Sequence, residues 1–302
     1  MKEGAFRGWE LVQATARVCA MNLMLHGIGS EKSVPVKVSD ALAADPGERF
    51  DVVLANPPFG KKSSTMIVGE DGKTSTEKDI VERDDFWATT SNKQLNFVQH
   101  IKTLLRAHGR AAVVVPDNVL FEGGAGETIR RKLMHERDVH TLLRLPTGLF
   151  YAQGVKAKVL FFDKKPASET PWTKKLWIYD LRTNEHFTLK TNPLKRADLD
   201  EFVTLYNPAN RHQRQATWAS TPDSKSGAGL DGRWRVYDYE ELIARDKASL
   251  DIFWLKDESL ADSDNLPPPE VIAQEIVDDL EAALEQFRLI AGDLNGKASE
   301  AA

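Results

Sequence analysis

Residues 50–60 have the sequence FDVVLANPPFG, which joins a hydrophobic strand to a stiff loop. Val52, Val53 and Leu54 form a short apolar run of the kind that is buried in a parallel sheet. Asn56 follows this run after a single alanine. In open α/β sheets, ligands bind beyond the carboxyl ends of the strands. The stretch therefore predicts an α/β fold with a binding loop at the end of this strand.

The loop itself, Asn56-Pro57-Pro58-Phe59, is suited to holding an amino group. The two prolines fix φ and remove backbone donors, so the loop is rigid and its carbonyls can accept hydrogen bonds. Asn56 adds a side-chain carbonyl, and two fixed acceptors match the two hydrogens of an exocyclic amine. Phe59 offers a flat face on which an extruded base can stack. The alternative is an ordinary Asn-Pro turn with a buried phenylalanine; the complete tetrapeptide after an apolar strand favours the binding loop.

Outward from this loop, apolar runs alternate with helical patterns from Ala5 to about Pro166, as in an α/β sheet. We expect mostly parallel pairing, because helices separate most of the strands. A polar segment of about 30 residues after Phe59 is expected to be a loop. The expected strands are 5–11, 34–40, 50–55, 111–117, 140–146 and 158–165, and the expected helices are 12–27, 92–108 (closed by Gly109) and 128–138.

Beyond Pro166 the pattern is weaker. One further strand is expected at 176–182, and residues 184–263 show no clear periodicity. After Pro267-Pro268-Pro269 the apolar residues recur at helical spacing, which predicts an amphipathic helix. That helix could pack on its own domain or form a coiled contact with a partner. We therefore expect a core at 1–166, an extension of mixed structure at 167–265 and a C-terminal helix at 266–302.

The composition is that of a globular protein, with 302 residues, 41% hydrophobic and 28% charged. There is no apolar run long enough to cross a bilayer and no secretory signal, so we expect a cytoplasmic protein without a membrane partner. The single cysteine, Cys19, rules out a disulfide framework and is expected in a helix core. The net charge of −5 argues against a stand-alone nucleic-acid binder. Basic contacts would be local or supplied by a partner; Arg130, Arg131 and Lys132 are expected at a helix surface.

Several stretches resemble the modification (M) subunit of type I restriction–modification systems, a family of amino-methyltransferases. The tetrapeptide NPPF is similar to the catalytic motif of that family. The similarity covers nearly the whole chain, including GWELVQATARVCAMNLMLHGIG (8–29), VSDAL (38–42), RAAVVVPDNVLFEGGAGETIRRKL (110–133), RLPTGLFYAQGVKAKVLFF (144–162) and TNPLKRADLDEF (191–202).

The resemblance implies roles for the loop residues. Asn56 and the Pro57 carbonyl would hold the target amino group, and Phe59 would stack on the adenine. Phe150 and Tyr151, between the last two core strands, would complete the base pocket; a loop without base contact is the alternative.

The resemblance also implies a binding site for S-adenosylmethionine. Glu10 would bind the ribose hydroxyls, which a carboxylate can do by accepting from two vicinal groups. Leu11 would pack on the adenine ring of the cofactor, and Asp40 would accept from its amino group. Alternatively, Glu10 is a solvated acid at the start of a helix and Asp40 is a plain turn residue.

The chain departs from the family pattern in two places. The Gly-rich turn that cradles the methionine part of the cofactor precedes Glu10 in the family and is not found here; EGGAGE (122–127) follows the wrong strand and is interpreted as a loop. We thus expect a partial Rossmann-like methyltransferase sheet without its first strand, with an α-helical C-terminal extension and weak cofactor binding. Lys158 stands where a polar uncharged residue is expected.

The predicted function is methyl transfer from S-adenosylmethionine to the N6 amino group of adenine in duplex DNA. By resemblance, the partners are a specificity subunit and, in a complete system, a restriction subunit. The seven histidines show no spacing with Cys or Asp that suggests a metal site. Two alternatives stay open: methylation of a protein glutamine or RNA amino group, and a truncated, non-catalytic remnant that serves assembly or DNA binding.

Overall fold

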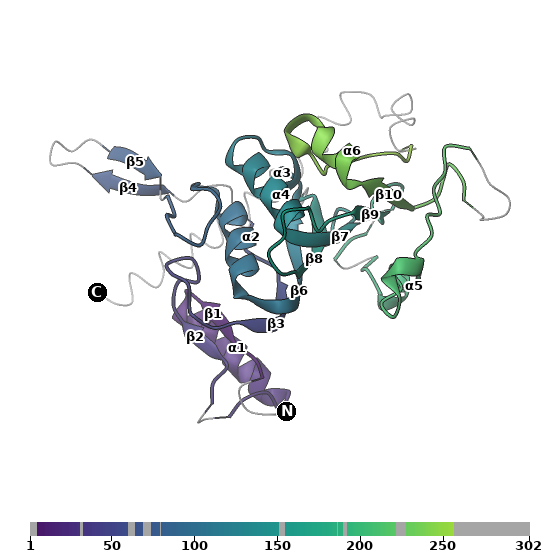
Figure 1. The fold of residues 1–302 in the computed structure, drawn as a ribbon. Helices are drawn as coiled ribbons and strands as arrows, with labels where there is room; N and C mark the ends of the chain where they lie inside the picture. Colours follow the sequence, from purple (N-terminus) through teal and green to yellow (C-terminus); the bar gives the residue numbers. More distant parts are fainter. Residues whose placement is uncertain are drawn as a thin grey trace, which may run out of the picture. The chain divides into compact units, whose positions relative to one another are not determined.

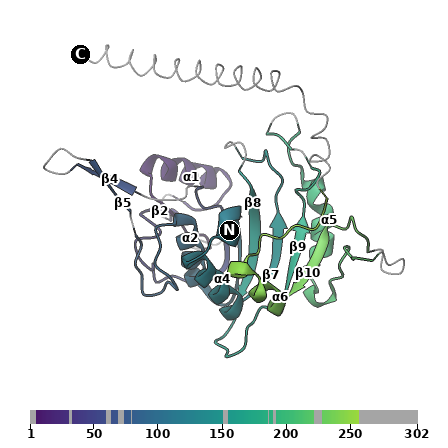
Figure 2. The same cartoon turned by 90° about the horizontal axis from the view of Figure 1, so that it is seen from above.

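The computed structural model describes residues 5–30, 33–59, 64–68, 74–78, 80–150, 155–185, 187–189, 192–221 and 228–256, of which 64–68 and 74–78 are described as backbone. A six-stranded sheet with the order β10-β9-β7-β8-β6-β3 forms its centre. Figure 2 shows β8, β7, β9 and β10 of this sheet side by side. Its strands are β3 (Phe50–Ala55), β6 (Leu105–Pro116), β7 (Arg137–Arg144), β8 (Ala157–Lys164), β9 (Lys175–Asp180) and β10 (Trp234–Asp238).

The sheet is mixed, so the expectation of mostly parallel pairing was wrong. β3 pairs with β6 and β7 with β9 in parallel, whereas β8 is antiparallel to both β6 and β7, and β10 is antiparallel to β9. The reason lies in the connection from β7 to β8, residues 145–156, which carries no described helix. A parallel neighbour needs a long crossover, but a direct connection lets β8 return antiparallel beside β7.

The N-terminal strands form a layer of their own. β1 (Gly8–Glu10) and β2 (Val36–Val38) pair in parallel as a two-stranded sheet, and α1 (Gln13–Leu25) connects them. Among the described strands, none pairs with the second edge of β3 or with the second edge of β1. The expected absence of a strand between these edges stays a prediction.

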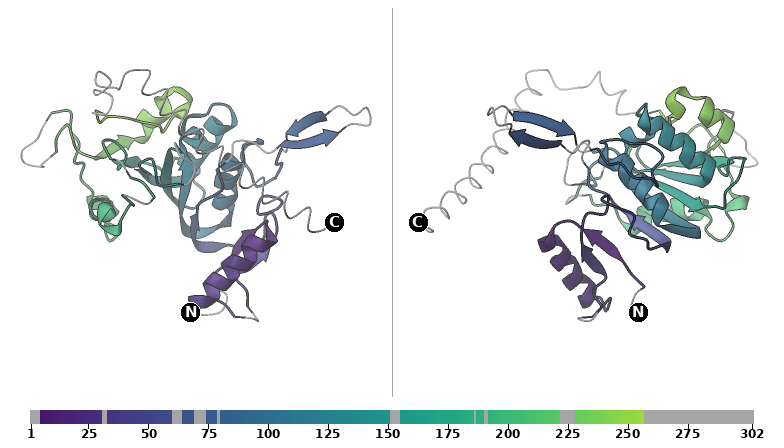
Figure 3. Two further views of the ribbon diagram at one scale, coloured as in Figure 1. Left: turned by 180° about the vertical axis from the view of Figure 1, so that it is seen from behind. Right: turned by 60° about the vertical axis from the view of Figure 1, so that its left-hand side comes forward.

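Two hydrophobic cores lie on opposite faces of the six-stranded sheet. Leu142 and Ile178 belong to one core and their neighbours Leu143 and Tyr179 to the other, because successive strand residues point to opposite faces. Figure 3 shows α2 and α4 along the first face. The helices that contribute to this first core are α2 (Lys93–Leu104), α3 (Asp117–Phe121), α4 (Ala125–Glu136) and α6 (Tyr239–Ala244). Phe202 of α5 (Asp200–Tyr206) packs in the second core.

Two local predictions differ from the structure. The polar segment expected as a loop contains an antiparallel pair, β4 (Ser64–Val68) and β5 (Thr74–Lys78), seen at the upper left of Figure 1. Gly109 does not close α2 but lies inside β6, which begins directly after the helix. A Cβ atom at Gly109 would meet the Phe50 carbonyl oxygen at 2.9 Å, so the close approach of β3 explains the glycine.

Three burial predictions were also wrong. The run at 52–54 was expected to be buried, but Val52 and Leu54 are exposed, because of these three residues only Val53 points to the face of β3 that packs against the first core. Cys19 is exposed, because α1 packs through smaller residues such as Ala16 and turns Val18 and Met21 outward as well. Arg130 is buried, because its guanidinium donates to four backbone carbonyls, among them those of Val119 and Ala248. No helix within the described ranges is long and apolar enough to cross a membrane.

The chain beyond Pro166 adds to the same sheet. β9 and β10 come from the region expected as an extension, and residues 1–255 form one compact unit. Three short 3-10 turns complete the described elements: Arg196–Leu199, Arg211–Gln213 and Asp246–Ala248. The helix predicted at 266–302 lies outside the described residues.

Candidate active site

A cavity of about 570 Å³ lies at the carboxyl ends of β1, β2 and β3, with α2 as a further wall. Six of the seven residues predicted for the site line it: Glu10, Leu11, Asp40, Asn56, Pro57 and Pro58. They come from three separate strand ends, and the fold brings them together. Phe59 is the seventh, and it is not among the lining residues.

Glu10 ends β1 and has two roles in this wall. Its Oε1 accepts a hydrogen bond from the Val12 backbone N–H at 2.8 Å, so the carboxylate caps the start of α1. Its backbone carbonyl accepts from the Ser39 N–H at 3.1 Å, which ties the end of β1 to the end of β2. Within the described part of the chain, Oε2 has no hydrogen-bond partner. Leu11, the next residue, lines the cavity with 65% of its surface exposed.

Asp40 follows β2 and lines the cavity while also organising its own turn. Its Oδ1 accepts from the Leu42 backbone N–H at 2.8 Å, the geometry of an Asx turn. The turn interpretation of Asp40 and the binding interpretation are therefore compatible, because one carboxylate oxygen serves the turn.

The loop after β3 presents Asn56 to the cavity. Asn56 is exposed, and its side chain makes no hydrogen bond to another described residue. Pro57 is buried and Pro58 is exposed, so the first proline anchors the loop while the second faces solvent. The preceding Ala55 pairs with Val113 of β6, which fixes the point at which the loop leaves the sheet. The acceptor groups are thus carried on a rigid corner.

Phe59 turns from the cavity toward a second aromatic residue. It is half-buried and meets Phe150 edge to face, with ring centroids 5.0 Å apart and an interplanar angle of 80°. Both rings pack against the second core. Phe150 belongs to the connection between β7 and β8, where the base pocket was expected to be completed. Tyr151 lies outside the described residues.

Aromatic residues and a histidine of the cavity wall did not figure in the sequence-based site. Trp9 of β1 meets Phe50 at a centroid distance of 5.9 Å, and Phe97 and His100 project from α2. The helical spacing gives a signal for His100, because it shares the face of Phe97 and Leu104 at intervals of three and four residues.

His100 is buried and its imidazole is held neutral. Burial, reinforced by the positive charge of Arg83, lowers the pKa of His100 to about 4. The Arg83 Nη1 lies 3.1 Å from its Nδ1, and Arg83 also pairs with Asp85 at 2.8 Å. This wall of the cavity is therefore uncharged at neutral pH, apart from Lys93 at the start of α2.

Comparison with known proteins gives a consistent family. Residues 1–226 match the family described as N-6 DNA methylase. The chain is 40% identical over 313 residues to the type I restriction enzyme StySJI methylase subunit of Salmonella typhimurium, covering 96% of this chain and 56% of that protein. It is 40% identical over 320 residues to the EcoKI methylase subunit of Escherichia coli K12, covering 98% of this chain and 57% of that protein.

The solved structures agree with the sequences. The crystal structure of the EcoKI M protein superposes with a TM-score of 0.68 and 37% identity, over 93% of this chain and 58% of that one. A structure described as showing complex assembly and conformational transition of a type I restriction–modification system superposes with a TM-score of 0.61 and 25% identity, over 96% of this chain and 54% of that one. The chain thus spans a little more than half the length of these relatives.

Proposed function

The chain belongs to the N-6 DNA methylase family, and from this premise we propose that it is the catalytic part of a DNA adenine-N6 methyltransferase, the modification subunit of a type I restriction–modification system. One observation carries the proposal: Asn56, Pro57 and Pro58 open onto the same cavity as Glu10 and Asp40. The candidate site for the target amino group and the candidate site for the cofactor therefore lie in one cavity.

The loop residues act on the target amino group by accepting its hydrogens. Oδ1 of Asn56 and the carbonyl oxygen of Pro57 are two acceptors on a rigid corner, matched to the two N–H bonds of an adenine N6 group. Accepting both bonds localises the nitrogen lone pair and directs it away from the loop. Neither acceptor titrates near neutral pH, so the proton released from N6 after methylation goes to solvent. Catalysis of this kind consists of positioning and fixed dipoles.

The cavity suits the adenosine half of S-adenosylmethionine, whose sulfonium supplies an electrophilic methyl group when bound. Its volume of about 570 Å³ lies in the range of small-molecule sites. We assign Glu10 to the ribose hydroxyls, Leu11 to one face of the adenine ring and Asp40 to the adenine amino group. Among the described lining residues there is no glycine-rich turn; Gly8, the single glycine among them, lies within β1.

The pair formed by Phe59 and Phe150 supplies the aromatic surface for the target base. A base inside a duplex is out of reach of Asn56, so the adenine must be extruded before transfer. Phe59 is three residues from Asn56 and remains half-exposed beside Phe150. We assign this pair to stacking on the extruded adenine.

We assign sequence readout to another polypeptide. The net charge of −5 does not favour autonomous DNA binding. The relatives at 40% identity are named as methylase subunits of type I enzymes, which supports assembly with a specificity subunit and, for cleavage, a restriction subunit.

Replacing Asn56 by alanine tests the proposed reaction. The variant loses one of the two acceptors, so we expect at least about a hundredfold loss of methyl transfer to DNA, the usual size for removing one preorganised catalytic dipole. The assay measures transfer of labelled methyl groups from S-adenosylmethionine in the assembled enzyme that contains this chain, offering DNA, RNA and protein substrates side by side. Asn22→Ala, an exposed asparagine of α1, is the matched control.

Near-normal methylation by Asn56→Ala would refute the assignment of the loop. If RNA or a protein glutamine is labelled in preference to DNA, then that molecule is the substrate and the assignment to DNA is wrong. An unchanged melting temperature for both variants shows that the loss arises at the site rather than from unfolding.

A further inference from the structure

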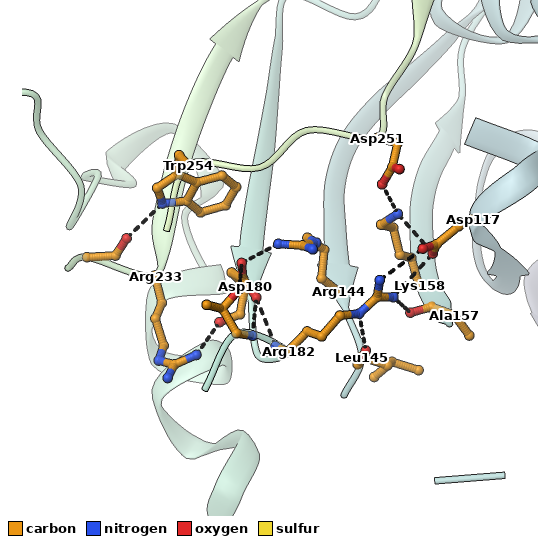
Figure 4. Close-up of polar contacts among 12 residues, drawn as sticks. Asp117, Arg144, Leu145, Ala157, Lys158, Asp180, Arg182, Arg233, Asp251 and Trp254 are labelled. Carbon is orange, nitrogen blue, oxygen red and sulfur yellow. Dashed lines mark hydrogen bonds and ion pairs between the residues drawn. The ribbon is translucent and has the colours of Figure 1, made fainter. Parts of the chain in front are cut away.

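A set of buried charges lies at the carboxyl ends of β6, β7 and β9 (Figure 4). The Asn56 loop leaves the sheet at the same end, because β3 is parallel to β6. We call it the buried charge network, and its members are Asp117, Arg144, Lys158, Asp180, Arg182 and Asp251. Asp117 follows β6, Arg144 ends β7 and Asp180 ends β9, while Lys158 stands near the start of the antiparallel β8. The network therefore surrounds the point where the chain leaves β7 and enters β8.

Arg182 holds both ends of that connection. Its Nε donates to the Leu145 carbonyl at 2.8 Å and its Nη2 donates to the Ala157 carbonyl at 2.9 Å. Leu145 and Ala157 are the residues on either side of segment 146–156, and the Leu145 N–H donates to the Ala157 carbonyl at 3.1 Å. One guanidinium thus closes the base of the segment that carries Phe150.

Asp117 holds Arg182 in turn. Its two carboxylate oxygens accept from Nη1 and Nη2 of Arg182 at 2.9 and 3.2 Å, the fork geometry that only arginine provides. The Asp117 backbone N–H donates to the Lys156 carbonyl at 3.1 Å, a second direct contact with the segment. Lys158, fully buried, donates to both Asp117 and Asp251. This arrangement accounts for a lysine at the position where an uncharged residue was expected.

The backbone of Arg182 is fixed independently. Oδ1 of Asp180 accepts from the N–H groups of Arg182 and Thr183, each at 2.9 Å, and the opposite oxygen pairs with Arg144. The turn after β9 therefore presents Arg182 to the segment without help from the segment itself. Arg182 keeps only 11% of its side chain exposed.

Buried ion pairs are a poor device for stability alone, because desolvation offsets much of their attraction. Here Arg182 donates not only to the carboxylate of Asp117 but also to the carbonyls of Leu145 and Ala157, which flank one segment. That segment brings Phe150 to Phe59, at a centroid distance of 5.0 Å. The network thus has a geometric result that an apolar cluster would not supply.

We propose that Arg182 is a positioning residue for methyl transfer: by holding segment 146–156 at both ends, it keeps Phe150 against Phe59 on the surface where the extruded base stacks. The inference rests on the proposed function. Arg182 does not line the cofactor cavity. Its effect on the reaction should therefore arise from the position of Phe150 beside the target base and not from cofactor binding.

Amide hydrogen exchange on the full chain tests the clamp without any assay of activity. In Arg182→Lys the charge stays but the fork is lost, so the amides of Leu145 and Asp117, which donate to the carbonyls of Ala157 and Lys156, should exchange at least about tenfold faster, as expected when a hydrogen-bonded segment opens more often. Arg130→Lys is the matched control, since it also removes a buried guanidinium that donates to backbone carbonyls. Unchanged exchange of the Leu145 and Asp117 amides in Arg182→Lys overturns the proposal.

A double-mutant cycle in the assembled enzyme tests the link to catalysis. We expect Arg182→Lys and Phe150→Ala each to lower the single-turnover rate about tenfold, the size of one lost base–aromatic contact. The double variant should be no slower than Phe150→Ala, because Arg182 acts through Phe150. The affinity for S-adenosylmethionine should not change in any of them.

If the rate losses of Arg182→Lys and Phe150→Ala multiply in the double variant, or if the affinity for the cofactor falls, then Arg182 does not act through Phe150. If Arg182→Lys does not melt cooperatively, Asp117→Asn takes its place in the cycle, since it preserves the shape and weakens the hold on Arg182. A wild-type assembly that fails to methylate adenine would refute the proposed function, while the exchange experiment would still decide on the clamp.

Discussion

His100 shows how a single side chain in the cavity wall can be kept uncharged. It is 3% exposed, and its Nε2 is buried with no hydrogen-bond partner in the described structure. A proton on this ring would place a second positive charge beside Arg83 in a poorly solvated site. The unfolded chain has no such restriction, so folding and protonation at His100 oppose each other.

A pH dependence of stability follows from the lowered pKa of His100. Between its folded pKa of about 4 and the ordinary value of about 6.5, the unfolded state binds the proton and the folded state does not. The contribution of His100 to the free energy of unfolding should therefore be fully present above that window. Within the window the free energy should fall with decreasing pH, with a slope of up to about 1.4 kcal/mol per pH unit.

Urea denaturation at several pH values between 4 and 7 measures this slope. His100→Gln cannot gain a proton and should flatten the profile. His140 serves as the internal control. Burial also lowers the pKa of His140, so the part of the pH dependence that comes from His140 should remain in His100→Gln. A slope unaffected by His100→Gln would show that His100 is not the group responsible.

Among single residues, the sequence predicted cavity-lining residues at or just after the ends of strands. Glu10, Asp40 and Asn56 could be placed there because the carboxyl end of a strand is a fixed place in an α/β fold. The contact between Phe59 and Phe150 could not be derived from local pattern, because it depends on the path of a distant connection. Arg182 gave no signal, since its function lies in bonds to backbone carbonyls.

The element that connects β7 to β8 is restrained in the middle as well as at its ends. Gly148 has φ of 81°, and a Cβ atom there would lie 2.0 Å from the Phe187 carbonyl oxygen. A glycine is needed at this position for two reasons, the left-handed conformation and the close approach of another backbone.

Gly148→Ala should therefore destabilise the protein by more than the conformational cost alone. Gly124 is the matched control, because its φ of 60° is also positive but a Cβ atom there would meet nothing within 4 Å. We expect about 1 kcal/mol for Gly124→Ala and at least about 2 kcal/mol for Gly148→Ala, where the backbone must also move. Free energies of unfolding from urea titration measure both, and equal losses would contradict the packing argument.

The individual elements were predictable where their periodicity was strong, as in α2, β3 and β6. The strand order was not, because it depends on whether a helix intervenes between two strands. β8 lies between β6 and β7 for that reason, and β10 was hidden in a region whose mixed composition gave no regular alternation. The prediction that α2 ends at Gly109 was wrong because glycine is favoured both at the end of a helix and where another backbone approaches closely.

In the molecule as a whole, β1 and β2 form a sheet that is separate from the six-stranded sheet. Exposed apolar side chains occur both on the helix that connects β1 to β2 and on the six-stranded sheet. Leu25 of α1 is 85% exposed, and Leu54 of β3 is 78% exposed. Under our assignment, the described walls of the cavity offer groups for the ribose and the adenine of the cofactor, and no glycine-rich turn for its methionine part is among them.

We accordingly expect weak binding of S-adenosylmethionine to this 302-residue chain, with a dissociation constant on the order of 1 mM, or about −4 kcal/mol. Titration calorimetry measures it directly, and Glu10→Gln should weaken it further if the ribose lies where we assign it. Asp138→Asn, a partly buried carboxylate outside the cavity lining, is the control. Micromolar affinity would contradict the expectation and imply that the methionine part is held by residues we have not assigned.

The closed base of segment 146–156 has a consequence for enzyme engineering. Because Leu145 and Ala157 bond to each other and are both held by Arg182, both ends of this segment stay in place when a residue between them changes. The segment is therefore suited to loop grafting: libraries that vary Phe150 while leaving both anchors and Gly148 intact would alter the preference for the acceptor nucleobase.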